Sequence, residues 1–308
     1  MRRTIVAALL MMSPLSLPSA VSAGAMTYLS LGDSVAFGET DFAQTPSNGN
    51  RGFVKLYDQY LGKQYGANPN VVNLAIDGET SSSLLSGSGR VPYAPGITDA
   101  NLAAMNTHYA GNTTESQNVR LVKAVANQWR QGHTIGDVTI SLGANDLFKL
   151  AGTPAFLAAS ASQQQAMLAK TLGTVASNYS TLLGEIKGLL PNAHVVLLGE
   201  YNPFPATPSN PLNAVAAPAI QGLNATIEGL ARKYNASYAD TYTPFVGHEA
   251  ALTHIVDMPG NVQPNARGYA AIAGAVEAVP EPSTLAVLGL GLVGLATQAR
   301  RRRSRVSA

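Results

Sequence analysis

The chain has 308 residues, of which 46% are hydrophobic and 12% are charged, a balance typical of a globular protein and not of a disordered one. The formal net charge of +2 comes from the two ends, because residues 1–25 and 283–308 hold seven arginines and no acidic residue. The part between them is acidic overall, so the composition gives no support to nucleic-acid binding. The chain has no cysteine, which excludes disulfides and thiolate metal sites.

The first 25 residues have the pattern of a secretory signal peptide. Arg2 and Arg3 are followed by an apolar run over 5–12 and then by small residues, with cleavage expected after Ala23 or Ala25. This pattern predicts export across the inner membrane. A membrane anchor that stays attached is the alternative reading of the same pattern.

From residue 26 onward, short apolar runs alternate with longer segments of helical periodicity. The predicted strands are 27–31, 71–76, 138–142, 194–198 and 237–239. The predicted helices are 53–65, 116–131, 162–190, 212–234 and 265–278. This alternation predicts an α/β sandwich around a parallel sheet. Two irregular stretches, 86–114 and 202–211, are expected to line a cleft, because long loops in compact domains are often functional.

Three predicted strands end in residues suited to acyl transfer. The first ends in Gly32-Asp33-Ser34, the second in Asp77-Gly78, and the third in Gly143-Ala144-Asn145-Asp146. In an open α/β sheet, ligands bind at the carboxyl ends of the strands. Acyl transfer needs a nucleophile and donors aimed at the developing oxyanion, which a serine, a glycine N–H and an asparagine amide can supply.

The stretches "LSLGDSVAFGE", "NLAIDGETSS" and "ISLGANDLF" resemble the first three conserved blocks of the SGNH/GDSL hydrolases, in the same order. The resemblance covers residues 26–276 and implies a flavodoxin-like three-layer α/β/α sandwich with a five-stranded parallel sheet. It implies hydrolysis of esters, acylated sugars and lipids included. Nothing in the sequence indicates a cofactor. Ser34 matches the nucleophile, while the N–H groups of Ser34 and Gly78 and the Asn145 amide match the oxyanion hole.

Each of these residues also has a plain structural interpretation. Ser34 could serve as the N-cap of a helix, and Asn145 or Asp146 could cap the next one. Gly78 could be an ordinary turn glycine. Asp33 belongs to the motif but does not match the family's triad acid, so we expect it to shape the turn.

The fourth block of the family is present but altered. The stretch "GNVQPNARGYAAIA" resembles it, yet Gln263 stands where the family has its catalytic histidine and Gly260 where it has an aspartate. Glutamine has no titrating proton and cannot act as a general base. The sequence therefore leaves open which group, if any, activates Ser34.

The chain has five histidines that could replace the missing one. His194 precedes a buried strand and is expected to be structural, and His133 precedes the third strand at the wrong end. His108 lies in the long loop. His248 and His254 resemble a zinc H-E-x-x-H motif, but their spacing of six places them on different helix faces. His254, nine residues before the glutamine of the fourth block, is the possible substitute base.

The last residues resemble the bacterial PEP-CTERM sorting tail. Val-Pro-Glu-Pro at 279–282 precedes an uncharged apolar stretch over 283–299 and an arginine cluster. The resemblance implies recognition by an exosortase, and such proteins tend to come from producers of exopolysaccharide. The apolar stretch is just long enough for a short transmembrane helix, which would anchor the chain transiently.

These observations predict a signal peptide over 1–25, a hydrolase domain over 26–278 and a sorting tail over 279–308. The predicted function is a secreted serine ester hydrolase, either an esterase or lipase or a carbohydrate-ester deacylase. The alternative is a catalytically impaired pseudoenzyme, or a ligand-binding envelope protein, that kept the cleft. A structural component of an extracellular matrix is the third reading.

Overall fold

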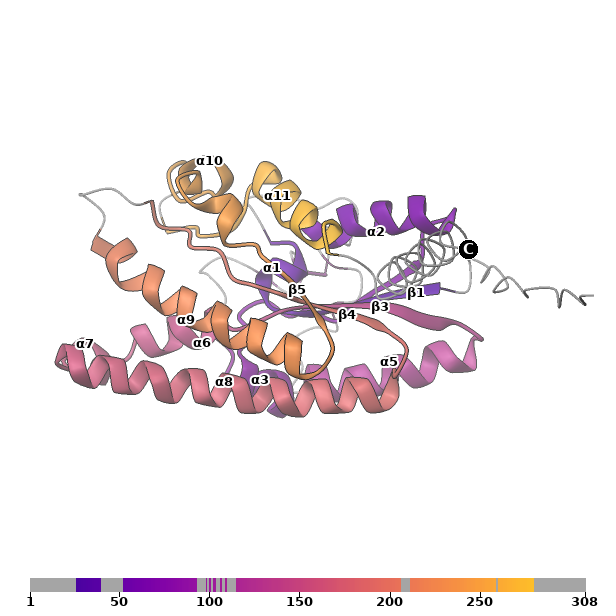
Figure 1. The fold of residues 1–308 in the computed structure, drawn as a ribbon, viewed down its shortest axis with the longest axis horizontal. Coiled ribbons are helices and arrows are strands. Elements are labelled where there is room, and N and C mark those ends of the chain that lie inside the picture. Colours follow the sequence, from indigo (N-terminus) through magenta and orange to yellow (C-terminus); the bar gives the residue numbers. More distant parts are fainter. Residues whose placement is uncertain are drawn as a thin grey trace, which may run out of the picture.

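Five strands form one parallel sheet in the centre of the molecule (Figure 1). They are β1 (Met26–Gly32), β2 (Asn70–Asn73), β3 (Thr134–Ser141), β4 (His194–Leu198) and β5 (Ser237–Ala239). Their order is β2-β1-β3-β4-β5, and every neighbouring pair is parallel. This confirms the predicted five-stranded parallel sheet.

The computed structural model describes residues 26–39, 52–92, 98, 100, 102–103, 106, 109, 115–205, 211–258 and 260–279. The predicted signal peptide, the apolar stretch over 283–299 and His108 lie outside these ranges. Within the described ranges, no helix is both long enough and apolar enough to cross a membrane.

Helices cover both faces of the sheet, which confirms the three-layer sandwich (Figure 1). One layer contains α1 (Ser34–Phe37), α2 (Gly52–Tyr65), α10 (Glu249–Leu252) and α11 (Ala266–Glu277). The other contains α3 (Ser81–Ser86), α5 (Gln117–Arg130), α8 (Ala161–Leu189) and α9 (Pro211–Lys233). Strand β4 shows why both faces need a layer of helices. All five of its residues are buried, and Val195 and Val196 enter hydrophobic cores on opposite faces of the sheet.

Most predicted elements agree with the structure to within a few residues. Helix α5 begins after its N-cap Ser116, whose side chain accepts the Val119 N–H. Strand β3 begins four residues earlier than predicted, because Gly136 and Asp137 interrupt the apolar run that marks the strand in the sequence. The pairing of β1 with β3 shifts register between Thr27 and Tyr28, which accommodates the interruption.

Several short elements were not predicted from the sequence. They are α3, α6 (Ala144–Ala151), α7 (Pro154–Leu157), the 3₁₀ turn η2 (Thr243–Phe245) and α10. Short helices have little stability of their own, so hydrophobic periodicity does not reveal them. Helix α3 depends on a capping box in which Thr80 and Ser83 bind each other's backbone N–H groups.

The strand order places the ends of β1, β2 and β3 side by side at one edge of the sheet. Strand β2 pairs with one side of β1, whereas β3 pairs with the other side and is followed outward by β4 and β5, so the strand order reverses at β1. A crevice forms at such a switch point, at the carboxyl ends of the strands. The three sequence blocks that follow these strands therefore meet there.

Candidate active site

Ser34 is the first residue of α1, directly after β1. The N-cap is Asp33, whose Oδ1 accepts the Val35 N–H at 3.1 Å. Ser34 is therefore not the N-cap, and its side chain is not used to begin the helix. The turn requires glycine at position 32, which has a φ of 138° and where a Cβ would lie 2.0 Å from the Ser141 carbonyl oxygen.

Gly78 lies in a tight turn after β2. The Glu79 N–H donates to the Ile76 carbonyl at 3.3 Å, and Gly78 has a φ of 70° at the third position of this turn. A Cβ on Gly78 would lie 2.1 Å from the Val91 carbonyl oxygen. Only glycine fits this position. Gly78 also lines the cavity described below.

Asn145 lies in the first turn of α6, directly after β3. Its Nδ2 donates to the Glu79 carbonyl at 3.0 Å, which ties the amide to the Gly78 turn. Neither Asn145 nor Asp146 caps α6, because the N-cap position is Gly143, which has no side chain to form a cap. Asp146 instead accepts two hydrogen bonds from Ser81, each of 2.8 Å.

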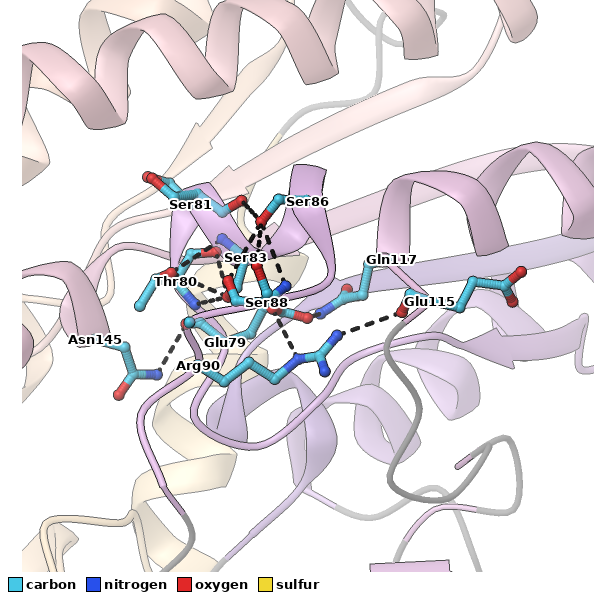
Figure 2. Close-up of polar contacts among 12 residues, drawn as sticks. Glu79, Thr80, Ser81, Ser83, Ser86, Ser88, Arg90, Glu115, Gln117 and Asn145 are labelled. Carbon is cyan, nitrogen blue, oxygen red and sulfur yellow. Dashed lines mark hydrogen bonds and ion pairs between the residues drawn. The ribbon is translucent and has the colours of Figure 1, made fainter.

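A buried polar network supports this edge of the sheet (Figure 2). The Glu79 carboxylate accepts from Arg90 at 3.0 Å and from Gln117 at 2.7 Å. Gln117 also binds the backbone N–H and carbonyl of Gly32, at 3.0 and 2.6 Å. The network joins the turns after β1 and β2, and Asn145 joins it through the Glu79 backbone, so the positions of the three blocks are coupled.

Four of the five predicted site residues line one cavity of about 790 Å³, namely Ser34, Gly78, Asn145 and Gln263. Gly260, at the position of the family's aspartate, also lines it. The remaining walls are mostly apolar and come largely from α6, α7, α8 and α9, with Val91, Pro92, Tyr201, Pro203, Phe204 and Val262 from loops. They include Leu147, Phe148, Leu150, Phe156, Leu168, Leu212, Val215, Ala216, Ala219 and Ile220.

His254 and Gln263 face each other across a short antiparallel pairing, but only Gln263 lines the cavity. The His254 N–H donates to the Gln263 carbonyl at 3.0 Å. The His254 Nδ1 lies 2.9 Å from Asp257 Oδ2, so this ring is paired with a carboxylate outside the cavity. The Gln263 Oε1 is buried and has no hydrogen-bond partner within the described chain.

The other described histidines lie away from these residues. His194 is buried at the amino end of β4, between Asp137 at 3.3 Å and Ser237 at 3.1 Å, which confirms its structural role. His133 precedes β3 and contacts Gln128 at 2.9 Å, while His248 is exposed. Within the described ranges, no three His, Cys, Asp or Glu side chains are placed to hold a metal ion.

Four carboxyl groups line the same cavity: Asp33, Glu39, Asp77 and Glu200. Neither Glu39 nor Glu200 was among the site residues expected from the sequence. Glu200 follows the end of β4, so the strand-end rule that selected Ser34 would also have found it. No lysine, arginine or histidine is among the described residues that line the cavity.

Burial raises the pKa of these carboxyl groups. The pKa of Asp33 rises to about 8, mainly through burial and further through the charges of Asp77 and Asp146, against the Val35 N–H. Burial and the neighbouring Asp77 raise the pKa of Glu39, which shares a hydrogen bond with Asp77. The pKa values of Asp77 and Glu200 are also raised, chiefly by burial.

Comparisons with known proteins agree with this fold. The structure is similar to the lipase Lip_vut3 from a goat rumen metagenome, with 21% identity, coverage of 82% of this chain and 96% of that chain, and a TM-score of 0.55. It is also similar to a mutant of Axe2, an acetyl-xylooligosaccharide esterase from Geobacillus stearothermophilus, with 15% identity, coverage of 83% and 94%, and a TM-score of 0.52. At these identities the likeness establishes the fold alone.

No curated protein matches the chain. Residues 278–303 match the PEP-CTERM protein-sorting motif. Residues 30–271 match the GDSL-like lipase/acylhydrolase model, which covers most of the chain. The chain therefore belongs to the GDSL-like lipase/acylhydrolase family, a family of carboxylic ester hydrolases.

Proposed function

We propose that the protein hydrolyses carboxylic esters through a seryl-acyl intermediate on Ser34. The observation that supports this most strongly is the shared cavity of Ser34, Gly78 and Asn145, which come from three different strand ends. In this scheme Ser34 Oγ attacks the ester carbonyl. The Ser34 N–H and the Asn145 amide stabilise the oxyanion, and the Gly78 N–H joins them by exchanging the Asp77 carboxylate, to which it donates in the structure, for the ester oxygen.

The walls of the cavity favour an ester with a long or bulky apolar group over a simple acetyl ester. A cavity of about 790 Å³ has room for a drug-sized ligand, and most of its lining side chains are aliphatic or aromatic. An acetyl group would leave most of this apolar surface in contact with water, whereas a long acyl chain would displace that water. The substrate class is therefore lipid-like esters, acylated sugars with long chains included.

A ligand-binding protein without catalysis is the second candidate, because Gln263 occupies the position of the family's histidine. Its buried Oε1 has no partner within the described chain and can accept a hydrogen bond from a bound ligand. In this reading the cavity binds the ester but does not cleave it.

We expect the protein to act at the cell envelope or outside the cell. The sorting motif over 278–303 supports export and delivery to the cell envelope or the outside, with an exosortase as the partner. The apolar stretch over 283–299 then anchors the chain in the membrane transiently before processing.

Release of p-nitrophenol from acyl esters of two to twelve carbons tests the activity. We expect hydrolysis by the wild type, best with medium or long chains, and none by Ser34→Ala. If wild type and Ser34→Ala are equally inactive while Gln263→His gains activity, catalysis by the native protein is refuted and ligand binding stands.

The substrate class has its own test on α9. Ala216 lines the cavity, whereas Ala214 on the same helix is exposed and does not. Ala216→Trp should lower the rate on long chains about tenfold or more and spare two-carbon esters, while Ala214→Trp should change neither. Equal effects of the two variants would contradict the apolar site.

A further inference from the structure

The proposed reaction needs a group that accepts the Ser34 proton, and the cavity holds few candidates. Gln263 cannot accept it, and His254 does not line the cavity and is paired with Asp257. The Tyr201 hydroxyl donates to the Val262 carbonyl at 2.9 Å. The other titratable residues on the described wall are the four carboxyl groups.

Three of these carboxyl groups already have other roles. Asp33 caps α1. Glu39 and Asp77 share a hydrogen bond, and Asp77 also accepts the Gly78 N–H. Glu39 Oε2 is buried without a partner in the described chain, but Glu39 donates its own proton to Asp77 and so is not available to accept another. A carboxyl group that donates to its neighbour, or whose oxygens already accept hydrogen bonds from the chain, is a poor proton acceptor.

Glu200 differs because a backbone N–H, and not a second carboxyl group, holds one of its oxygens while the other has no partner in the described chain. Its carboxylate accepts the Ala144 N–H at the start of α6, whereas Oε1 is buried without a partner in the described chain. The Asn224 side chain fixes the backbone, accepting the Glu200 N–H at 2.7 Å and donating to its carbonyl at 2.8 Å. This is an oriented carboxylate with a free acceptor on the wall that it shares with Ser34.

We propose that Glu200 is the general base of this enzyme, taking the place of the family's histidine. The inference rests on the proposed esterase function. Glu200 removes the Ser34 Oγ proton, directly or through one water, as Oγ bonds to the ester carbonyl carbon. The proton then passes to the departing alcohol oxygen when the C–O bond breaks. In the second half, Glu200 takes a proton from water, the hydroxide attacks the acyl carbon, and the proton returns to Ser34 as the acid leaves.

The surroundings of Glu200 suit this role at neutral pH. Burial raises its pKa well above the usual value, the charges of Asp33 and Asp146 raise it further, and the Ala144 N–H opposes them. The charge of Glu200 in turn contributes to the raised pKa values of three tyrosines, Tyr179, Tyr201 and Tyr238. A base works best when its pKa lies near the operating pH. The rate should therefore rise with pH as Glu200 loses its proton, and the midpoint of this rise should lie well above pH 4.5.

The test compares wild type, Ser34→Ala, Glu200→Gln and a matched control, all as full-length protein. Glutamine keeps the shape of Glu200 and an oxygen for the Ala144 N–H but cannot accept the proton. Glu249→Gln is the control, because Glu249 is also buried and accepts the Gly247 N–H at 3.0 Å without lining the cavity. The measurements are kcat/KM for a p-nitrophenyl ester from pH 5 to 9, and Tm.

We expect Glu200→Gln to lose at least about 100-fold in kcat/KM without a loss of Tm, since a positioned base contributes about 10² to 10⁴. Its residual rate should lack the acid limb of the wild type, and Glu249→Gln should match the wild type. If Ser34→Ala is inactive but Glu200→Gln stays within about threefold of the wild type, the role of Glu200 is overturned and the esterase function stands. The same holds if Glu249→Gln loses as much kcat/KM as Glu200→Gln. If Ser34→Ala equals an active wild type, the proposed function itself fails.

Discussion

Replacing Asp33 with asparagine removes one ionisable group from the buried wall of the cavity while keeping the helix cap. Asparagine is as good an N-cap as aspartate, and its Oδ1 can still accept the Val35 N–H. In the native state Asp33 holds its proton up to about pH 8, whereas in the unfolded chain it ionises near 3.8. Between these values the native state binds about one more proton, so stability falls as pH rises.

The size of the effect follows from this proton difference. One bound proton changes the free energy of unfolding by about 1.4 kcal/mol per pH unit. From pH 5 to pH 7, Asp33 alone therefore lowers the stability of the wild type by about 3 kcal/mol. For a domain of this size, that corresponds to about 5 to 10 °C in Tm. Below pH 3.8 the contribution of Asp33 is constant, because both states are protonated.

Urea unfolding of wild type and Asp33→Asn at pH 5, 6 and 7 measures this contribution. The wild type should lose more stability than the variant with each rise of one pH unit. In the variant, only the other buried carboxyl groups still make the stability depend on pH. The stabilities of the two proteins should therefore diverge toward pH 7, with Asp33→Asn the more stable. Parallel pH dependences would refute the reasoning that burial keeps Asp33 protonated.

Three further substitutions test the support of the site. Gln117→Leu leaves the Gly32 N–H without its partner and removes one donor each from the Gly32 carbonyl, which keeps the Ile76 N–H, and from the buried Glu79 carboxylate. It should cost about 3 to 5 kcal/mol in urea unfolding, whereas Gln221→Leu, which breaks an exposed hydrogen bond, should cost under about 0.5 kcal/mol. Gly32→Ala would place a Cβ 2.0 Å from the Ser141 carbonyl oxygen and should leave little soluble folded protein, as judged by gel filtration. His254→Ala should change kcat/KM by less than about threefold, because this ring does not line the cavity; a loss of 100-fold would restore it as the base.

The strand ends of the first three blocks could be predicted because their signals are local. Glycine, aspartate and serine after an apolar run mark a tight turn, and Gly32 and Gly78 do adopt positive φ values there. The two apolar faces of β4 likewise indicated a strand buried on both sides. Short helices such as α3 and α10 were missed, because they depend on caps and tertiary packing.

By itself the sequence determined the parallel α/β architecture, the candidate nucleophile and the absence of histidine at position 263, since all of these follow from the order of residues along the chain. Only the tertiary structure decided how His254 and Gln263 lie relative to the cavity, because it places Gln263 on the cavity wall and His254 away from it. The same holds for Glu200, whose pKa and unpartnered oxygen arise from its burial among residues distant in sequence. Burial depends on which distant segments pack together, and that packing also decides which carboxyl group can stand in for the missing base.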